Sequence, residues 1–142
     1  MYADAGDPGR LSAVVSGLRS VAPAGEPAIY FSAVLELMAG RPHDVLRIVG
    51  DLRDRGMMRA RDLTVEATAY AALGRTDDAR RAFAAAIAAD PRNISGYENL
   101  ATFEAQSGDD RAAVALFAEA LILDRTSSVA RAGITAALRR VR

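Results

Sequence analysis

Apolar residues in this chain recur at helical spacing, and the same pattern returns every 34 residues. Ala79, Phe83 and Ala86 follow one another at i, i+4 and i+7, which places them on one face of a helix. Residues of similar character occupy the equivalent places in three other stretches: Leu11, Val15 and Leu18; Val45, Val49 and Leu52; Ala113, Phe117 and Ala120. The pattern predicts a series of amphipathic helices related by a sequence repeat.

Glycine and proline mark the same period. Four glycines follow one another at intervals of 34 residues: Gly6, Gly40, Gly74 and Gly108. A fixed period of this length is typical of helical repeat arrays. We expect each glycine to end a first helix in the left-handed conformation, and Pro23 and Pro91, seventeen residues after Gly6 and Gly74, to follow the end of a second helix.

Residues 60–93 closely resemble one tetratricopeptide repeat. The positions that carry the resemblance are the small, aromatic and turn residues of that family: Ala67, Tyr70, Gly74, Ala79, Phe83, Ala86 and Pro91. The next 34 residues match again, except that Arg125 replaces the proline: Tyr97, Leu100, Ala101, Gly108, Ala113, Phe117 and Ala120. Residues 26–59 match more weakly, through Ala33 and Gly40, with Val45, Val49 and Leu52 as apolar substitutes.

The resemblance implies an all-α fold, a right-handed α–α superhelix of antiparallel helix pairs. We expect one domain over residues 1–142, divided into a partial repeat (1–25), three full repeats (26–59, 60–93 and 94–127) and a capping helix (128–142). Tyr2 falls at the tyrosine position of a first helix whose beginning is absent. We therefore expect a piece of a longer protein, in which Leu11, Val15 and Leu18 have lost part of their packing.

Paired acids stand at the predicted starts of second helices. Asp77 and Asp78 follow Thr76, which we expect to be an N-cap, and Asp109 and Asp110 stand at the predicted start of the equivalent helix in the next repeat. A hard-cation site is the alternative for such pairs. We favour capping, because carboxylates are stabilised by the positive end of a helix. Asp7, before Pro8, is a third predicted N-cap.

The residues needed for catalysis are scarce. Cysteine and lysine are absent, and His43 is the only histidine, expected as a solvated residue at the turn into a helix. Nucleophilic triads, Schiff-base chemistry and multi-histidine metal sites therefore have no basis in this chain. The glycines lie at turns, not in a phosphate-binding loop after a strand. We predict that the chain is not an enzyme and binds neither cofactor nor metal.

Three carboxylates, Glu36, Glu66 and Glu104, occupy helix positions that normally pack against the partner helix. A buried carboxylate is costly unless it is paired. One interpretation is a polar pocket between repeats. The favoured one is exposure at an edge beside an arginine such as Arg80 or Arg81.

The family resemblance also implies a concave groove lined by one face of each first helix. Carried onto this chain, the candidate partner-binding residues are Tyr30, Val34, Leu37, Met38, Arg61, Thr64, Thr68, Glu98, Thr102 and Gln106, and the same face includes Ser95 and Ala105. Some family members hold a terminal carboxylate with lysine and asparagine here, and this chain lacks both at the matching positions. The expected groove is apolar at one end and lined by hydroxyl groups in the middle.

The resemblance implies a non-catalytic scaffold that binds a protein or peptide segment. Two alternatives remain: a targeting or regulatory domain of a larger enzyme, and a self-association module that forms a homo-oligomer. RNA binding, known from related helical pairs, is disfavoured because the formal net charge is zero. No apolar run approaches the ~20 residues of a membrane span. We therefore expect no nucleic-acid partner and no membrane insertion.

Overall fold

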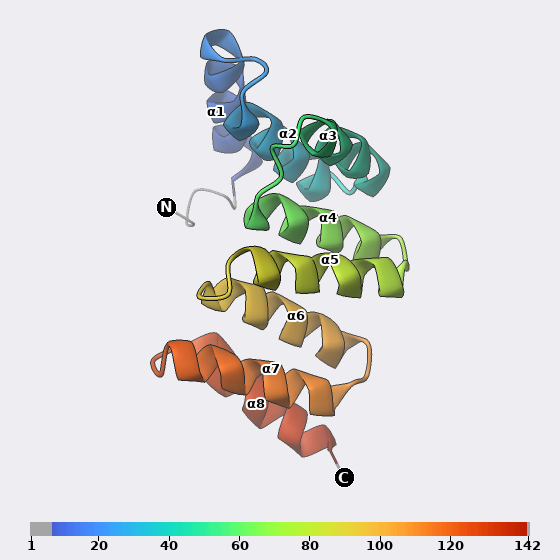
Figure 1. Ribbon diagram of the computed structural model, residues 1–142, viewed down its shortest axis with the longest axis vertical. Helices are drawn as coiled ribbons and strands as arrows, with labels where there is room; N and C mark the ends of the chain where they lie inside the picture. The colour runs from blue at the N-terminus through green and yellow to red at the C-terminus, as the bar shows by residue number, and fades with distance from the viewer. Residues whose placement is uncertain (1–6, 142) are drawn as a thin grey trace.

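The computed structural model describes residues 7–141, and this part of the chain folds into eight α-helices joined by short turns (Figure 1). The helices are α1 (Pro8–Val21), α2 (Glu26–Met38), α3 (Pro42–Asp54), α4 (Ala60–Ala72), α5 (Thr76–Ala89), α6 (Ile94–Gln106), α7 (Asp110–Leu123) and α8 (Ser128–Arg140). They stack in chain order from α1 at one end to α8 at the other. The described residues contain no strand, so the predicted all-α class is confirmed. Tyr2 and Gly6 lie outside the described residues.

Glycines end the first helix of each pair as the sequence predicts. Gly40, Gly74 and Gly108 have φ of 71°, 70° and 91°, in the left-handed region that disfavours a side chain. At each, the amide of the residue after the glycine bonds back to a carbonyl of the last turn, as in Arg75 N–H to Tyr70 O at 2.9 Å. Gly56 (φ 66°) ends α3 in the same way and was not predicted.

The predicted helix starts are confirmed in part. The Asp7 carboxylate accepts from the backbone N–H of Gly9 at 2.9 Å, and that of Asp109 accepts from Ala112 at 3.0 Å. Thr76 is not an N-cap: α5 already begins at Thr76, and Arg75 takes the cap position without a side-chain capping bond. Only Arg75 separates Gly74, at the end of α4, from the first residue of α5, so Arg75 occupies the cap position.

The core is a chain of small clusters, each shared by a helix pair and the following helix. The first cluster contains Ala33, Val45, Val49, Val65 and Ala69. In the second, the rings of Phe83 and Phe103 lie 5.4 Å apart between centroids. In the third, Phe117 packs among alanines of α6, α7 and α8. Because no single centre holds the fold together, each pair depends on its neighbours.

The inner side of the stack is formed by α2, α4, α6 and α8. Each of these helices contacts the next one in this set, whereas α1, α3, α5 and α7 make no contact with one another within residues 7–141. Helices that approach one another across repeats lie on the inside of the curve. The predicted groove residues lie on three of these helices, α2, α4 and α6.

Near the beginning of the chain, Leu11 and Val15 are only 4% and 3% exposed, and Leu18 is half-buried. These residues lie on α1, which packs against α2. That the three have lost part of their packing stays a prediction. Among the described helices, none is both long enough and apolar enough to cross a membrane.

Candidate functional site

Two hollows lie along the inner helices. The N-terminal groove pocket, about 320 Å³, is lined by Tyr30, Ala60, Arg61, Thr64, Val65, Ala86, Asn93, Ser95, Gly96 and Asn99. The C-terminal groove pocket, about 520 Å³, is lined by Thr102, Ala105, Gln106, Phe117, Val129, Gly133, Ala136 and Arg140. The structure therefore places five of the predicted groove residues at two pockets: Tyr30, Arg61 and Thr64 at the first, and Thr102 and Gln106 at the second.

Half of the residues that line the N-terminal groove pocket carry neutral polar side chains. The Thr64 hydroxyl donates to the Ala60 carbonyl at 3.1 Å, which leaves its oxygen as an acceptor. The Asn93 side-chain oxygen accepts from the Ser95 backbone N–H at 3.0 Å and caps α6, which leaves its NH₂ group as a donor. Asn99 and the Ser95 hydroxyl add further donors and acceptors. Asn93 and Asn99 were not predicted as site residues.

Among the described residues, Arg61 is the only charged one that lines this pocket. Its guanidinium group is paired with the carboxylate of Glu26. Its Nε and Nη2 donate to Glu26 Oε1 at 3.0 and 2.7 Å, and its guanidinium carbon lies 4.2 Å from the centroid of the Tyr30 ring. Burial opposes the charge on Arg61, but the hydrogen bonds and negative charge of Glu26 outweigh it and raise the Arg61 pKa. Glu26 is 3% exposed. Sequence reasoning missed it, because 35 residues separate the pair.

Asp62 lies beside this ion pair and is wholly buried. One of its oxygens accepts from the Arg59 backbone N–H at 2.8 Å, while Oδ1 has no hydrogen-bond partner among the described residues. Burial, aided by the negative charge of Glu26, raises the pKa of Asp62 to about 6, against the opposing effects of the Arg59 N–H and the charges of Arg59 and Arg61. Proton uptake at this group is therefore linked to folding.

The other predicted groove residues are less available. Val34 and Leu37 are half-buried against the first core cluster, so Met38, at 40% exposure, is the exposed member of the expected apolar end. The Thr68 hydroxyl donates to the Thr64 carbonyl at 2.9 Å. Glu98 accepts a hydrogen bond from the Ser127 hydroxyl at the start of α8. Part of the predicted surface thus holds the helices together.

The three unusual carboxylates are all paired, but not all where expected. Glu104 binds Arg80 through two hydrogen bonds of 2.6 and 3.0 Å, as predicted. Glu66 instead binds Arg53, with both bonds at 2.7 Å, and Glu36 binds Arg41. The expectation of edge exposure is wrong for Glu66 and Glu104, which are buried. Their guanidinium partners come from the neighbouring repeat and compensate for burial.

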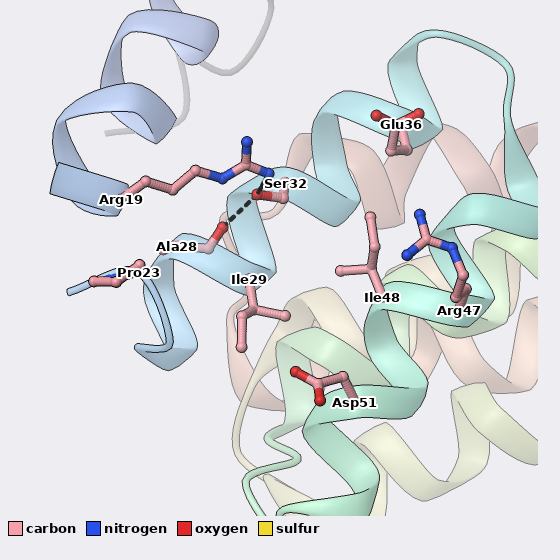
Figure 2. Close-up of a pocket in the computed structure, with 9 residues that line it drawn as sticks. All are labelled: Arg19, Pro23, Ala28, Ile29, Ser32, Glu36, Arg47, Ile48 and Asp51. Atoms are coloured by element: carbon pink, nitrogen blue, oxygen red, sulfur yellow. Dashed lines mark hydrogen bonds between the residues drawn. The ribbon is translucent and has the colours of Figure 1, made fainter.

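A third hollow, of about 450 Å³, lies between α1, α2 and α3 (Figure 2). In Figure 2, Arg19 reaches from α1 to Ser32 on α2, with a bond of 2.9 Å to its hydroxyl. Ser32 in turn donates to the Ala28 carbonyl at 2.7 Å. These hydrogen bonds connect α1 to α2, and none of the predicted groove residues lines this hollow.

His43, the predicted turn residue, is exposed at the start of α3.

Comparison with known proteins bears on the repeat. Residues 60–103 match the sequence model of the tetratricopeptide repeat. Together with the antiparallel helix pairs, this match identifies residues 60–103 as tetratricopeptide repeat sequence. No curated protein matches the sequence.

Solved tetratricopeptide structures share the fold at low identity. A thermophilic tetratricopeptide repeat protein of Thermus thermophilus, TTC0263, is 21% identical with a TM-score of 0.77, over 92% of this chain and 74% of that one. MamA of Desulfovibrio magneticus RS-1 is 20% identical with a TM-score of 0.69, over 89% and 72%. PcrH, solved with the chaperone binding region of PopB, is 19% identical with a TM-score of 0.63, over 80% and 91%. Such likeness establishes a helical repeat solenoid.

Proposed function

We propose that this chain is a non-catalytic scaffold that holds a segment of another polypeptide in the groove formed by α2, α4, α6 and α8. The observation that carries the proposal is the pair of pockets along these inner helices. The N-terminal pocket offers amide and hydroxyl groups that can pair with a peptide backbone, and the C-terminal pocket has a mostly apolar lining. An extended segment spanning both pockets could bury apolar side chains and pair its peptide groups.

A structural neighbour also supports a scaffold that binds polypeptides. The structural neighbour PcrH is described in complex with the binding region of PopB, which makes a polypeptide the natural class of ligand to test.

Self-association is the second candidate, and exposed apolar residues at both ends of the stack favour it. Val14 and Val21 are 48% and 86% exposed on α1, and Leu138, which lines neither groove pocket, is 54% exposed on α8. Association between ends would leave the groove free, so the two candidates make different predictions for mutations.

The proposal is tested by selecting binders from a displayed library of random peptides and measuring their affinity by calorimetry. Ser95→Arg places a bulky charge in the N-terminal groove pocket and should weaken binding at least tenfold, about 1.4 kcal/mol. Ala88→Arg, on the exposed side of α5, is the matched control and should leave affinity unchanged. Failure to select any binder, or equal affinity of both variants, would contradict the groove.

Light scattering tests self-association, the second candidate. A dimer that Leu138→Glu converts to a monomer, with no loss of peptide affinity, would place self-association at the end of the stack. A monomeric wild type would remove that candidate.

A further inference from the structure

The geometry points to Glu26 as the residue that sets the charge preference of the groove: by neutralising Arg61, it makes the N-terminal groove pocket select an uncharged polar segment of the bound polypeptide over an acidic one. This inference rests on the proposed function. It concerns which segments bind and not whether the groove binds at all.

Arg61 would otherwise be a strong site for a carboxylate. It is the sole charged residue among the described ones that line the pocket, and an arginine beside neutral hydrogen-bond donors normally favours an anion. Here its Nε and Nη2 both donate to Glu26, and Tyr30 covers one face of the guanidinium at 4.2 Å. The side of Arg61 that remains toward the pocket can donate a hydrogen bond but adds little net charge.

An acidic ligand cannot take Arg61 from Glu26 at low cost. Glu26 is 3% exposed, and its second cation, Arg59, lies farther away at 3.9 Å and is itself largely exposed. A ligand carboxylate that drew Arg61 away would leave Glu26 buried without its main partner, which is strongly destabilising. The buried Asp62 adds a further negative charge near Glu26 when it is ionised.

The rest of the lining suits peptide amides and neutral side chains. The NH₂ groups of Asn93 and Asn99 can donate to carbonyls, and the Thr64 hydroxyl oxygen can accept from an N–H. Ala86 and Gly96 leave room for a close approach. A segment with Gln, Asn, Ser or Thr at this point satisfies these groups without placing a charge against Glu26.

The test applies the displayed random-peptide library to the wild type and to Glu26→Gln. Glutamine keeps a hydrogen-bond acceptor for Arg61 but removes the negative charge, so the pocket should now prefer peptides with Asp or Glu. For one acidic and one neutral peptide that differ at a single residue, the affinity ratio should shift by about tenfold toward the acidic peptide. The wild type should bind its neutral peptides with little change between about 0.05 M and 0.5 M NaCl, and Glu26→Gln should bind acidic peptides more weakly as salt rises.

Glu66→Gln is the matched control. Glu66 is also a buried carboxylate held by an arginine of a neighbouring repeat, but neither it nor Arg53 lines the pocket. It should lose stability without any change in peptide charge preference. Should Glu26→Gln fail to fold, the double variant Glu26→Gln with Arg61→Gln replaces the ion pair by a neutral pair. Loss of the Arg61 donor should lower its affinity for all peptides, while neutral peptides should still bind better than acidic ones.

The outcomes distinguish this inference from the proposed function. Wild-type selection of acidic peptides that bind in the groove would overturn the inference and leave the scaffold intact. An unchanged preference in a folded Glu26→Gln, or a changed one in the double variant, would also overturn it. Selection of no peptide would overturn both.

Discussion

Buried carboxylates recur where neighbouring helices meet, and their partners determine whether they stabilise the fold. Glu26, Glu66 and Glu104 each accept at least two hydrogen bonds from one guanidinium. Asp62 is the exception among the buried carboxylates of the described chain, because Oδ1 has no partner. A single backbone N–H satisfies its other oxygen, and this is too little to offset the loss of hydration.

We predict that Asp62→Asn stabilises the protein at neutral pH. The folded chain holds a proton on Asp62 up to a pH of about 6, whereas the unfolded carboxylate loses it near its usual 3.8. The free energy of unfolding therefore falls as pH rises through this window and stays lower above it. The amide removes this penalty while still accepting from Arg59 N–H.

Thermal unfolding at pH 5 and pH 7.5 checks this. The gain from Asp62→Asn should be larger at pH 7.5 by about 1.4 kcal/mol. Asp90→Asn, at an exposed residue after α5, should show no such difference. Equal effects of Asp62→Asn at both pH values would show that Asp62 is ionised without penalty.

Gly74 and Gly50 should respond in opposite ways to alanine. Gly74 has φ of 70°, so Gly74→Ala should cost about 1 kcal/mol even though nothing lies near the added methyl group. Gly50 lies inside α3 with equal free space, and Gly50→Ala should stabilise by about 0.5–1 kcal/mol. Chemical denaturation measures both, and a shared sign would contradict the conformational argument.

At the scale of the helices, ion pairs between repeats add directional contacts to a core of small residues. Arg80 on α5 reaches Glu104 on α6, whereas the adjacent Arg81 binds Asp78 within its own helix. The side chain of Glu104 is 5% exposed and that of Asp78 is 26% exposed. The two neighbouring arginines therefore have different energetic roles.

We predict that Arg80→Ala costs about 2 kcal/mol and Arg81→Ala less than about 1 kcal/mol. The first change leaves a buried carboxylate without its partner, and the second removes a solvated pair. Urea denaturation of both variants measures the difference. Arg80→Ala combined with Glu104→Leu should recover much of the loss, and a double variant as unstable as the single one would contradict this explanation.

The contact between α7 and α8 depends on a glycine. A Cβ on Gly133 would overlap the ring of Phe117, which fills the third core cluster. Gly133→Ala should therefore push α8 away and cost about 1–3 kcal/mol. Ala132→Ser, at an exposed neighbouring position, is the control. Thermal unfolding measures the loss of stability. If Gly133→Ala is as stable as the wild type, the Phe117 ring can move aside.

Across the whole molecule, stability should vary along the stack, because contacts are made between neighbours. Helix α4 contacts α2, α3, α5 and α6, while α1 contacts only α2 among the described helices. Units in such arrays open from the ends. Native-state hydrogen exchange should therefore show the slowest amides in α4 and α5 and the fastest helical amides in α1. Uniform protection would mean that the chain unfolds as one cooperative unit.

The sequence by itself determined the helices and their order. The apolar period placed Val45, Val49, Phe83 and Phe117 in the core, and the positive φ of Gly40, Gly74 and Gly108 followed from their spacing. Such features depend on residues within one or two turns of each other. Local spacing therefore carries the information needed to predict them.

Only the tertiary structure decided which charges meet. Arg61 and Glu26 are 35 residues apart, and Glu66 pairs with Arg53 in place of the expected Arg80 or Arg81. Val34 and Leu37 pack partly against the first core cluster, and Asn93 and Asn99 line the N-terminal groove pocket. A long arginine side chain can reach several carboxylates, and the angle between stacked helix pairs selects one. That angle results from the packing of whole helices, so the sequence pattern of one repeat does not contain it.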